Sequence, residues 1–183
     1  MKTNNMDSTV HVCAATPNDS GLISRILERS IKVGCALDHR NQPAVVQAWA
    51  SNARQQRVSA WLADSSLQLC MGLLQDKPVG VGMARSDGRI LLCYVQPEFF
   101  RRGVGRAVMA ELERWLASHH HARARLHSTR TARGFYIHLG YQPCAEEVVV
   151  NGLPLLAMAK ALPTPCDNRP MVNPARGPHA SSP

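Results

Sequence analysis

The chain has 183 residues, a length typical of one domain that buries about two thirds of its unfolded surface. Its six cysteines form no Cys-x-x-Cys pair, which argues against a zinc or redox site, so we expect no metal. No apolar run approaches the ~18 residues of a membrane span, and no signal-peptide core lies near the start. We therefore expect a cytoplasmic protein with reduced thiols and no membrane partner.

The net charge of +8 is concentrated in one segment, because eight arginines and only two glutamates fall between residues 101 and 133. A local basic field suits a small polyanion. A nucleic-acid surface would also be basic, but it needs stacking aromatics or an insertable recognition helix. The apolar face of the helix in this segment is instead predicted to be buried, so nucleic acid is an unlikely partner.

The first third of the chain predicts one strand and then helices. Residues 10–15 alternate weakly, as in a strand, and apolar residues between 22 and 31 follow helical spacing. Residues 34–43 are predicted to be a loop. A second helical pattern covers residues 43–62, with room for a break near Ser51-Asn52.

The middle of the chain predicts an antiparallel meander over residues 67–75, 78–86 and 89–95. Asp87-Gly88 between the last two strands is a strong hairpin signal. Glycines inside the first two strands indicate a bulge or a close backbone approach; they are Gly72, Gly80 and Gly82.

The turn after the third of these strands predicts an anion site. Gln96-Pro97 ends the strand, and apolar residues from Val104 to about residue 118 have helical spacing. The first turn of a helix leaves N–H groups unpaired at the positive end of its dipole, and Gly103 and Gly105 let a phosphate approach them. Three arginines add positive charge, namely Arg101, Arg102 and Arg106.

The last part of the chain predicts a strand, a short helix that ends at Gly140, and a hairpin around Asn151-Gly152. Their ranges are 124–128, 131–139, 141–150 and 153–161. Residues 163–183 are rich in Pro and Ser, which predicts a disordered tail. We expect a flexible start over residues 1–9 and one domain over residues 10–162.

The glycine turn, Phe100-Arg101-Arg102-Gly103-Val104-Gly105, resembles motif A of the GCN5-related N-acetyltransferases (GNAT), Gln/Arg-x-x-Gly-x-Gly/Ala. It fits neither a Walker loop nor a dinucleotide fingerprint. Phe100 departs from the family pattern and cannot make the polar contacts of that position. The backbone N–H groups therefore carry the resemblance at this turn.

Residues 129–141 resemble motif B of the same family, Asn-x-x-Ala-x-x-Phe-Tyr-x-x-x-Gly-Phe/Tyr. Thr129 replaces the usual Asn, while Phe135-Tyr136 and Gly140-Tyr141 match. The two motifs in this order are far more specific than either alone, and the resemblance covers nearly the whole of residues 10–162.

The resemblance implies an α+β fold in which helices flank a mostly antiparallel sheet of about six to seven strands. Two parallel strands, ending at Val95 and Ser128, splay apart and admit the pantetheine arm of acetyl-CoA, the implied cosubstrate. The residues implied to bind it are Tyr94, Val95, Arg101, Arg102, Gly103, Val104, Gly105, Arg106 and Thr129.

For catalysis, the resemblance implies that Tyr136 protonates the departing thiolate and that a backbone N–H near Val95 stabilises the oxyanion. A core role for Tyr136, with its hydroxyl bonded to the backbone, is the alternative. Some family members have a Glu base where this chain has Arg89, and others have a His base where it has Leu155. His127 is the first candidate base because imidazole titrates in the useful range. Glu98, Glu146, Glu147 and a water relay are weaker choices.

The predicted function is acetyl transfer to a primary amine of a small molecule or peptide. In the family, the loop and helix between the first two strands form one wall of the acceptor site, which here would contain Asp38, His39 and Trp49. Residues of these types more often have a core or surface role. Two alternatives are a non-catalytic CoA-binding sensor and a basic nucleic-acid-contacting module. The sequence also leaves open whether the protein forms a homodimer.

Overall fold

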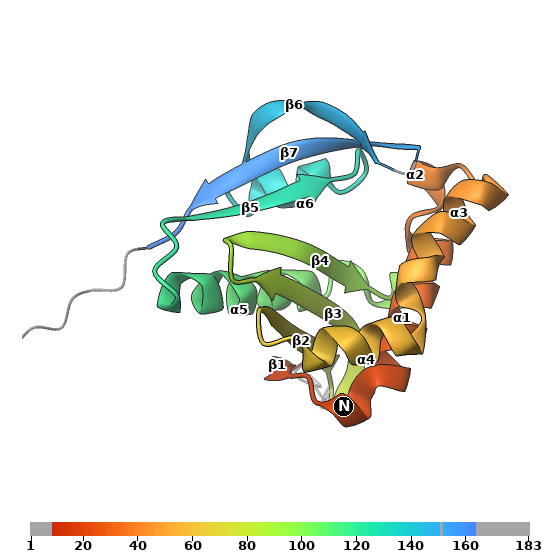
Figure 1. The fold of residues 1–183 in the computed structure, drawn as a ribbon, viewed down its shortest axis with the longest axis horizontal. Helices are drawn as coiled ribbons and strands as arrows, with labels where there is room; N and C mark the ends of the chain where they lie inside the picture. The colour runs from red at the N-terminus through yellow and green to blue at the C-terminus, as the bar shows by residue number, and fades with distance from the viewer. Residues whose placement is uncertain (1–8, 151, 164–183) are drawn as a thin grey trace, which may run out of the picture.

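The computed structural model describes residues 9–150 and 152–163, whose strands form one seven-stranded sheet in the order β1-β2-β3-β4-β5-β7-β6 (Figure 1). Neighbouring strands are antiparallel except β4 and β5, which are parallel. The expected α+β architecture is therefore confirmed. The strands are β1 Val10–Ala14, β2 Leu67–Leu74, β3 Lys77–Arg85, β4 Arg89–Val95, β5 Arg123–Ser128, β6 Gln142–Val150 and β7 Leu153–Ala161.

Helices cover both faces of the sheet. The apolar faces of α1 and α4 pack on one side of β2 and β3, and α5 packs on the other side. A Cβ atom at Gly82 would lie 2.4 Å from Val108 Cγ1, so the glycine lets α5 approach the strand closely, as predicted. The helices are α1 Ser20–Arg29, α2 Ala36–His39, α3 Pro43–Ala50, α4 Gln55–Ala63, α5 Val104–Ser118 and α6 Arg133–His138.

The region predicted as a loop, residues 34–43, differs from that prediction. A π-helical turn, η2 Ser30–Gly34, continues α1, and the four-residue helix α2 follows it. So short a helix has no apolar periodicity to detect. The second helical pattern does break near Ser51, where the 3₁₀ turn η3 Ser51–Ala53 separates α3 from α4.

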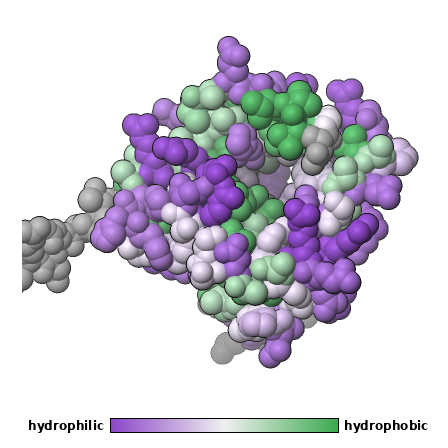
Figure 2. Space-filling model, viewed as in Figure 1, coloured by the Kyte–Doolittle hydropathy of each residue, from purple (hydrophilic) through white to green (hydrophobic). Residues whose placement is uncertain are grey.

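The two parallel strands separate almost as soon as they meet. Their register contains a single pair, Arg89 with Arg125, next to a hydrogen bond of 3.0 Å from Arg125 N–H to Gly88 C=O. Beyond this pair β4 and β5 diverge toward Val95 and Ser128, and Figure 2 shows a hollow between the two parts of the sheet. The splayed pair implied by the family resemblance is therefore present.

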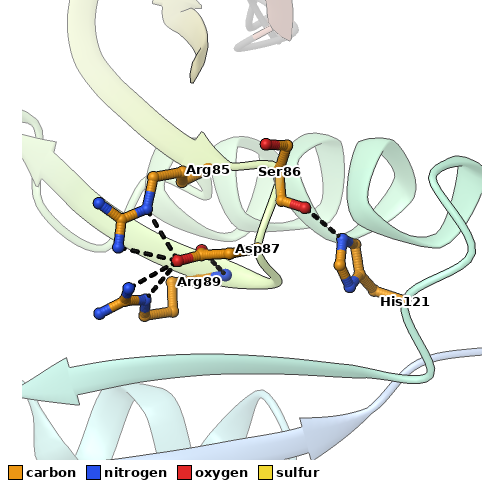
Figure 3. A network of polar contacts seen from close by, with 5 residues as sticks. All are labelled: Arg85, Ser86, Asp87, Arg89 and His121. Carbon is orange, nitrogen blue, oxygen red and sulfur yellow. Dashed lines mark hydrogen bonds and ion pairs between the residues drawn. The ribbon is translucent and has the colours of Figure 1, made fainter. Parts of the chain in front are cut away.

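The closed end of the splay is held by a polar network on the β3–β4 turn (Figure 3). The Asp87 carboxylate accepts hydrogen bonds from Arg89 Nε at 2.8 Å and Arg85 Nε at 2.9 Å. Hydrogen bonds from Arg89, and more weakly from Arg85, hold the pKa of Asp87 well below its usual range. His121, between α5 and β5, lies 2.8 Å from the Ser86 carbonyl oxygen through Nε2.

Candidate active site

The first turn of α5 has free amides. The helix begins at Val104 after Gly103, whose φ of +86° is left-handed, and no side chain of residues 9–150 or 152–163 caps the turn. The first hydrogen bond of the helix runs from Ala107 N–H to Gly103 C=O at 3.0 Å, which leaves the preceding N–H groups without helical partners. The side chains of Arg101, Arg102 and Arg106 are exposed around this turn. The turn therefore combines unpaired backbone N–H groups, the positive end of the helix dipole and three cationic side chains.

The turn fits against the end of β4 and the start of α6. A Cβ atom at Gly105 would lie 3.2 Å from Phe135 Cζ and 3.6 Å from Val95 Cγ2, whereas no atom of the described part of the chain lies within 4 Å of one at Gly103. Gly105 thus lets α5 approach Val95 and Phe135 closely, whereas Gly103 borders open space. That open space is where a phosphate could approach the backbone.

Tyr136 lies inside the protein beside this turn. It is 8% exposed, and its ring lies 5.1 Å from Phe135 and 5.8 Å from Tyr141, measured between centroids. Burial raises the pKa of Tyr136 well above its ordinary value, and the nearby Cys93, Tyr94 and Cys35 raise it further. The phenol is therefore neutral and protonated throughout the neutral range.

An aromatic group lies on the opposite side of the β4 end. Trp49 Nε1 donates a hydrogen bond of 2.7 Å to the Tyr94 hydroxyl, and the Trp49 ring meets the edge of His39 at a centroid distance of 6.1 Å. His39 is buried, with Nδ1 accepting from Asn41 N–H and Nε2 facing the Ile31 carbonyl oxygen, both at 3.0 Å. Because both ring nitrogens are engaged, His39 positions α2 and Trp49 and is unavailable as a base.

A cleft of about 260 Å³ lies beside this aromatic group, at the carboxyl end of β5. Its walls come from α2 and the turn into α3, from residues 129–131 after β5, and from the start of β7. Asp38 joins two of these walls, since its carboxylate accepts hydrogen bonds from Thr131 N–H at 3.1 Å and from the Thr131 hydroxyl.

The other predicted site residues, Thr129, His127 and Glu98, have different surroundings in the structure. Thr129 lines the cleft, and its hydroxyl lies 3.4 Å from Ala132 N–H in the turn before α6. His127 is exposed on β5 opposite Ala157, and its side chain forms no hydrogen bond or ion pair with the described residues. Glu98 pairs with Arg29, and that hydrogen-bonded pair lowers the pKa of Glu98, which makes it a weaker base.

Sequence reasoning named Asp38 but missed Thr131, Arg40 and Arg130, which also line the cleft. Asp38 and Thr131 are 93 positions apart, and such a contact leaves no periodic signal in the sequence. The structure thus brings Asp38, His39 and Trp49 close to Tyr94 and assigns His39 a structural role. Their part in an acceptor wall stays a prediction.

Among the described residues, no group of three or more His, Cys, Asp or Glu side chains could hold a metal ion. Within the same residues, no helix is long and apolar enough to cross a bilayer.

Comparison with known proteins gives one family. The acetyltransferase (GNAT) domain model matches residues 35–162. The uncharacterised Bacillus subtilis protein YyaT is 29% identical over 106 residues, which are 54% of this chain and 71% of that protein.

Solved structures share the fold. A GCN5-related N-acetyltransferase from Rhodopseudomonas palustris superposes with a TM-score of 0.75 at 24% identity, over 85% of this chain and 97% of that one. The PaiA N-acetyltransferase from Thermoplasma acidophilum, solved in complex with coenzyme A, gives a TM-score of 0.72 at 14% identity, over 84% and 99% of the two chains.

Proposed function

Because the chain belongs to the GNAT family and is an N-acetyltransferase, we propose that it transfers the acetyl group of acetyl-CoA to a primary amine by direct attack on the thioester. The acceptor would be a small molecule or a peptide. One observation carries the proposal: an uncapped helix start lies beside two parallel strands that separate after a single pair. The coenzyme A complex of PaiA, a protein of the same fold, supports it.

The turn before α5 would bind the pyrophosphate. The N–H groups from Gly103 to Arg106 donate to phosphate oxygens, while the exposed Arg101, Arg102 and Arg106 supply countercharge. The gap between β4 and β5 would hold the pantetheine arm, and the main chain of Tyr94 and Val95 would orient the thioester. Thr129, whose hydroxyl already faces Ala132 N–H, would contribute less than the Asn usual in the family.

In the chemical step, the neutral amine attacks the carbonyl carbon, the C–N bond forms and the C–S bond breaks. A backbone N–H near Val95 would donate to the oxyanion. Tyr136 would donate a hydrogen bond to the departing sulfur and then a proton. Burial raises the pKa of both the phenol and a thiolate at the same site, so this transfer remains feasible despite the raised pKa of Tyr136.

The proton lost by the amine needs an acceptor. We keep His127 as the candidate base because it lies exposed on the strand that borders the splay, with its ring free to meet a substrate. A relay through water is the alternative. Glu146 and Glu147 are exposed on β6 and are weaker choices.

The test is release of coenzyme A thiol from acetyl-CoA by the full chain over a panel of primary amines. We expect turnover that depends on both substrates, with acetylated amine and free thiol formed in equal amounts. A non-catalytic sensor would bind acetyl-CoA and release no thiol with any amine, which would contradict the proposal.

A further inference from the structure

The cleft beside Asp38 carries an excess of positive charge. Asp38, Arg40 and Arg130 are its charged lining residues, so two cations face one carboxylate. The remaining wall is partly apolar and includes Leu37, which is 82% exposed, and Val45. A cleft of about 260 Å³ suits a small amine or one residue of a peptide better than a larger ligand.

The carboxylate is already occupied. Both oxygens of Asp38 accept hydrogen bonds from Thr131, one from the backbone N–H and one from the hydroxyl. An acceptor ammonium group would have to compete with these bonds for Asp38. The carboxylate therefore serves to join α2 to the turn before α6 and is a poor site for a cationic ligand.

The two arginines, by contrast, are available. Arg40 is exposed and forms no ion pair with any residue that the structure describes. Arg130 lies 3.9 Å from Glu147, but their side chains are 72% and 46% exposed, so solvent screens this contact and leaves it weak. Exposed guanidinium groups with unused donors bind carboxylate and phosphate oxygens in bidentate geometry.

We propose that this cleft selects an acceptor amine that also carries an anionic group, a carboxylate or a phosphate, held by Arg40 and Arg130. The inference rests on the proposed function and names its acceptor class. The anion contacts the arginines, the apolar part of the acceptor contacts Leu37 and Val45, and the amine points toward the end of β4 near Tyr94.

Two matched pairs of probes test the proposal, each tested for thiol release from acetyl-CoA by the full chain. Leucine against leucinamide tests a carboxylate, and O-phosphoethanolamine against ethanolamine tests a phosphate. We expect the anionic member of at least one pair to have a kcat/KM, calculated on the concentration of its neutral amine, at least about 10-fold higher, as one charge-assisted bidentate contact provides. The pair that shows the preference identifies the anion.

Variants connect the preference to the arginines. In the Arg40→Gln and Arg130→Gln double variant, we expect the ratio between the members of a pair to fall below about 3-fold through loss of the charge-assisted contacts. Arg57→Gln is the matched control, since Arg57 is an exposed arginine on α4 outside the cleft, and it should leave the ratio unchanged.

The possible failures are distinguishable. If acetyl-CoA fails to raise the melting temperature, the proposed function fails and this inference fails with it. If acetyl-CoA protects the protein but the neutral members react as well as the anionic ones, or no probe reacts, the inference alone is overturned. A preference that persists in the double variant overturns it as well.

Discussion

In the proposed site, Gly103 is the residue on which binding of acetyl-CoA should depend most directly. Its φ of +86° disfavours any L side chain, and the space around it is open. Gly103→Ala should destabilise the fold by about 1 kcal/mol through backbone strain. It should also weaken acetyl-CoA binding about 10-fold or more, because the methyl group displaces a phosphate from charged hydrogen bonds. Calorimetric titration with acetyl-CoA measures this effect.

Gly140→Ala is the matched control for backbone strain. Gly140 has a φ of +91° at the end of α6, near Lys160 and away from the start of α5. It should lose a similar amount of stability and keep the affinity of the unmodified protein. An equal loss of affinity in both variants would mean that strain alone explains the effect at Gly103.

Tyr136 should act in the chemical step. Tyr136→Phe removes the phenol proton donor but keeps the buried ring, so we expect kcat to fall about 100-fold with little change in acetyl-CoA affinity. Tyr141→Phe is the control, because Tyr141 is also a buried tyrosine and its ring packs on Tyr136. Equal kcat values for Tyr136→Phe and the unmodified protein would assign Tyr136 to the core.

At the level of elements, the closed end of the splay should respond to pH. The pKa of Asp87 is lower in the folded than in the unfolded chain, so its arginine contacts stabilise the fold above pH ~4 and lose this effect as pH falls. Asp87 is 39% exposed, which limits the contribution to about 1 kcal/mol or less after solvent screening.

Asp87→Asn should therefore lower the melting temperature near pH 7, and the difference from the unmodified protein should shrink as pH falls toward 3. Thermal unfolding followed by circular dichroism at several pH values measures both. A difference that stays constant or grows on acidification would contradict this role of Asp87.

A second contact joins the last strand to α5. Lys160 Nζ lies 2.7 Å from Glu113 Oε2, and these side chains are 27% and 15% exposed. Lys160→Met would leave the Glu113 carboxylate mostly buried without its cation, which should destabilise the protein by about 2 kcal/mol. Thermal unfolding measures the loss, and adding Glu113→Leu should restore part of it. A double variant less stable than Lys160→Met would rule out this explanation.

Elements with strong local signals were predictable from the sequence. The Asp87-Gly88 hairpin, the glycine turn before α5 and the end of α6 at Gly140 each follow from a few neighbouring residues. The four-residue α2 was missed because it has no periodicity, and β4 contains an irregularity near Leu91 that its apolar run conceals. The start of the proposed cofactor site was thus predictable, and the proposed acceptor cleft was not, since three separate elements build it.

For the molecule as a whole, function depends on how the two parts of the sheet meet. Strands β1 to β4 and strands β5 to β7 join through the single pair of Arg89 with Arg125, and the helix after each parallel strand begins at the open end. The family match and the shared fold account for this arrangement. The central claim is that the open end binds acetyl-CoA through the amides of α5.

Thermal unfolding of the full chain with increasing acetyl-CoA tests that claim most directly. At a concentration about 100 times Kd, binding to the folded state alone adds about 2.7 kcal/mol of stability. For a chain of this size, we expect the melting temperature to rise by about 5–10 °C, and to rise less in Gly103→Ala at the same concentration. A melting temperature unchanged at millimolar acetyl-CoA would contradict the account.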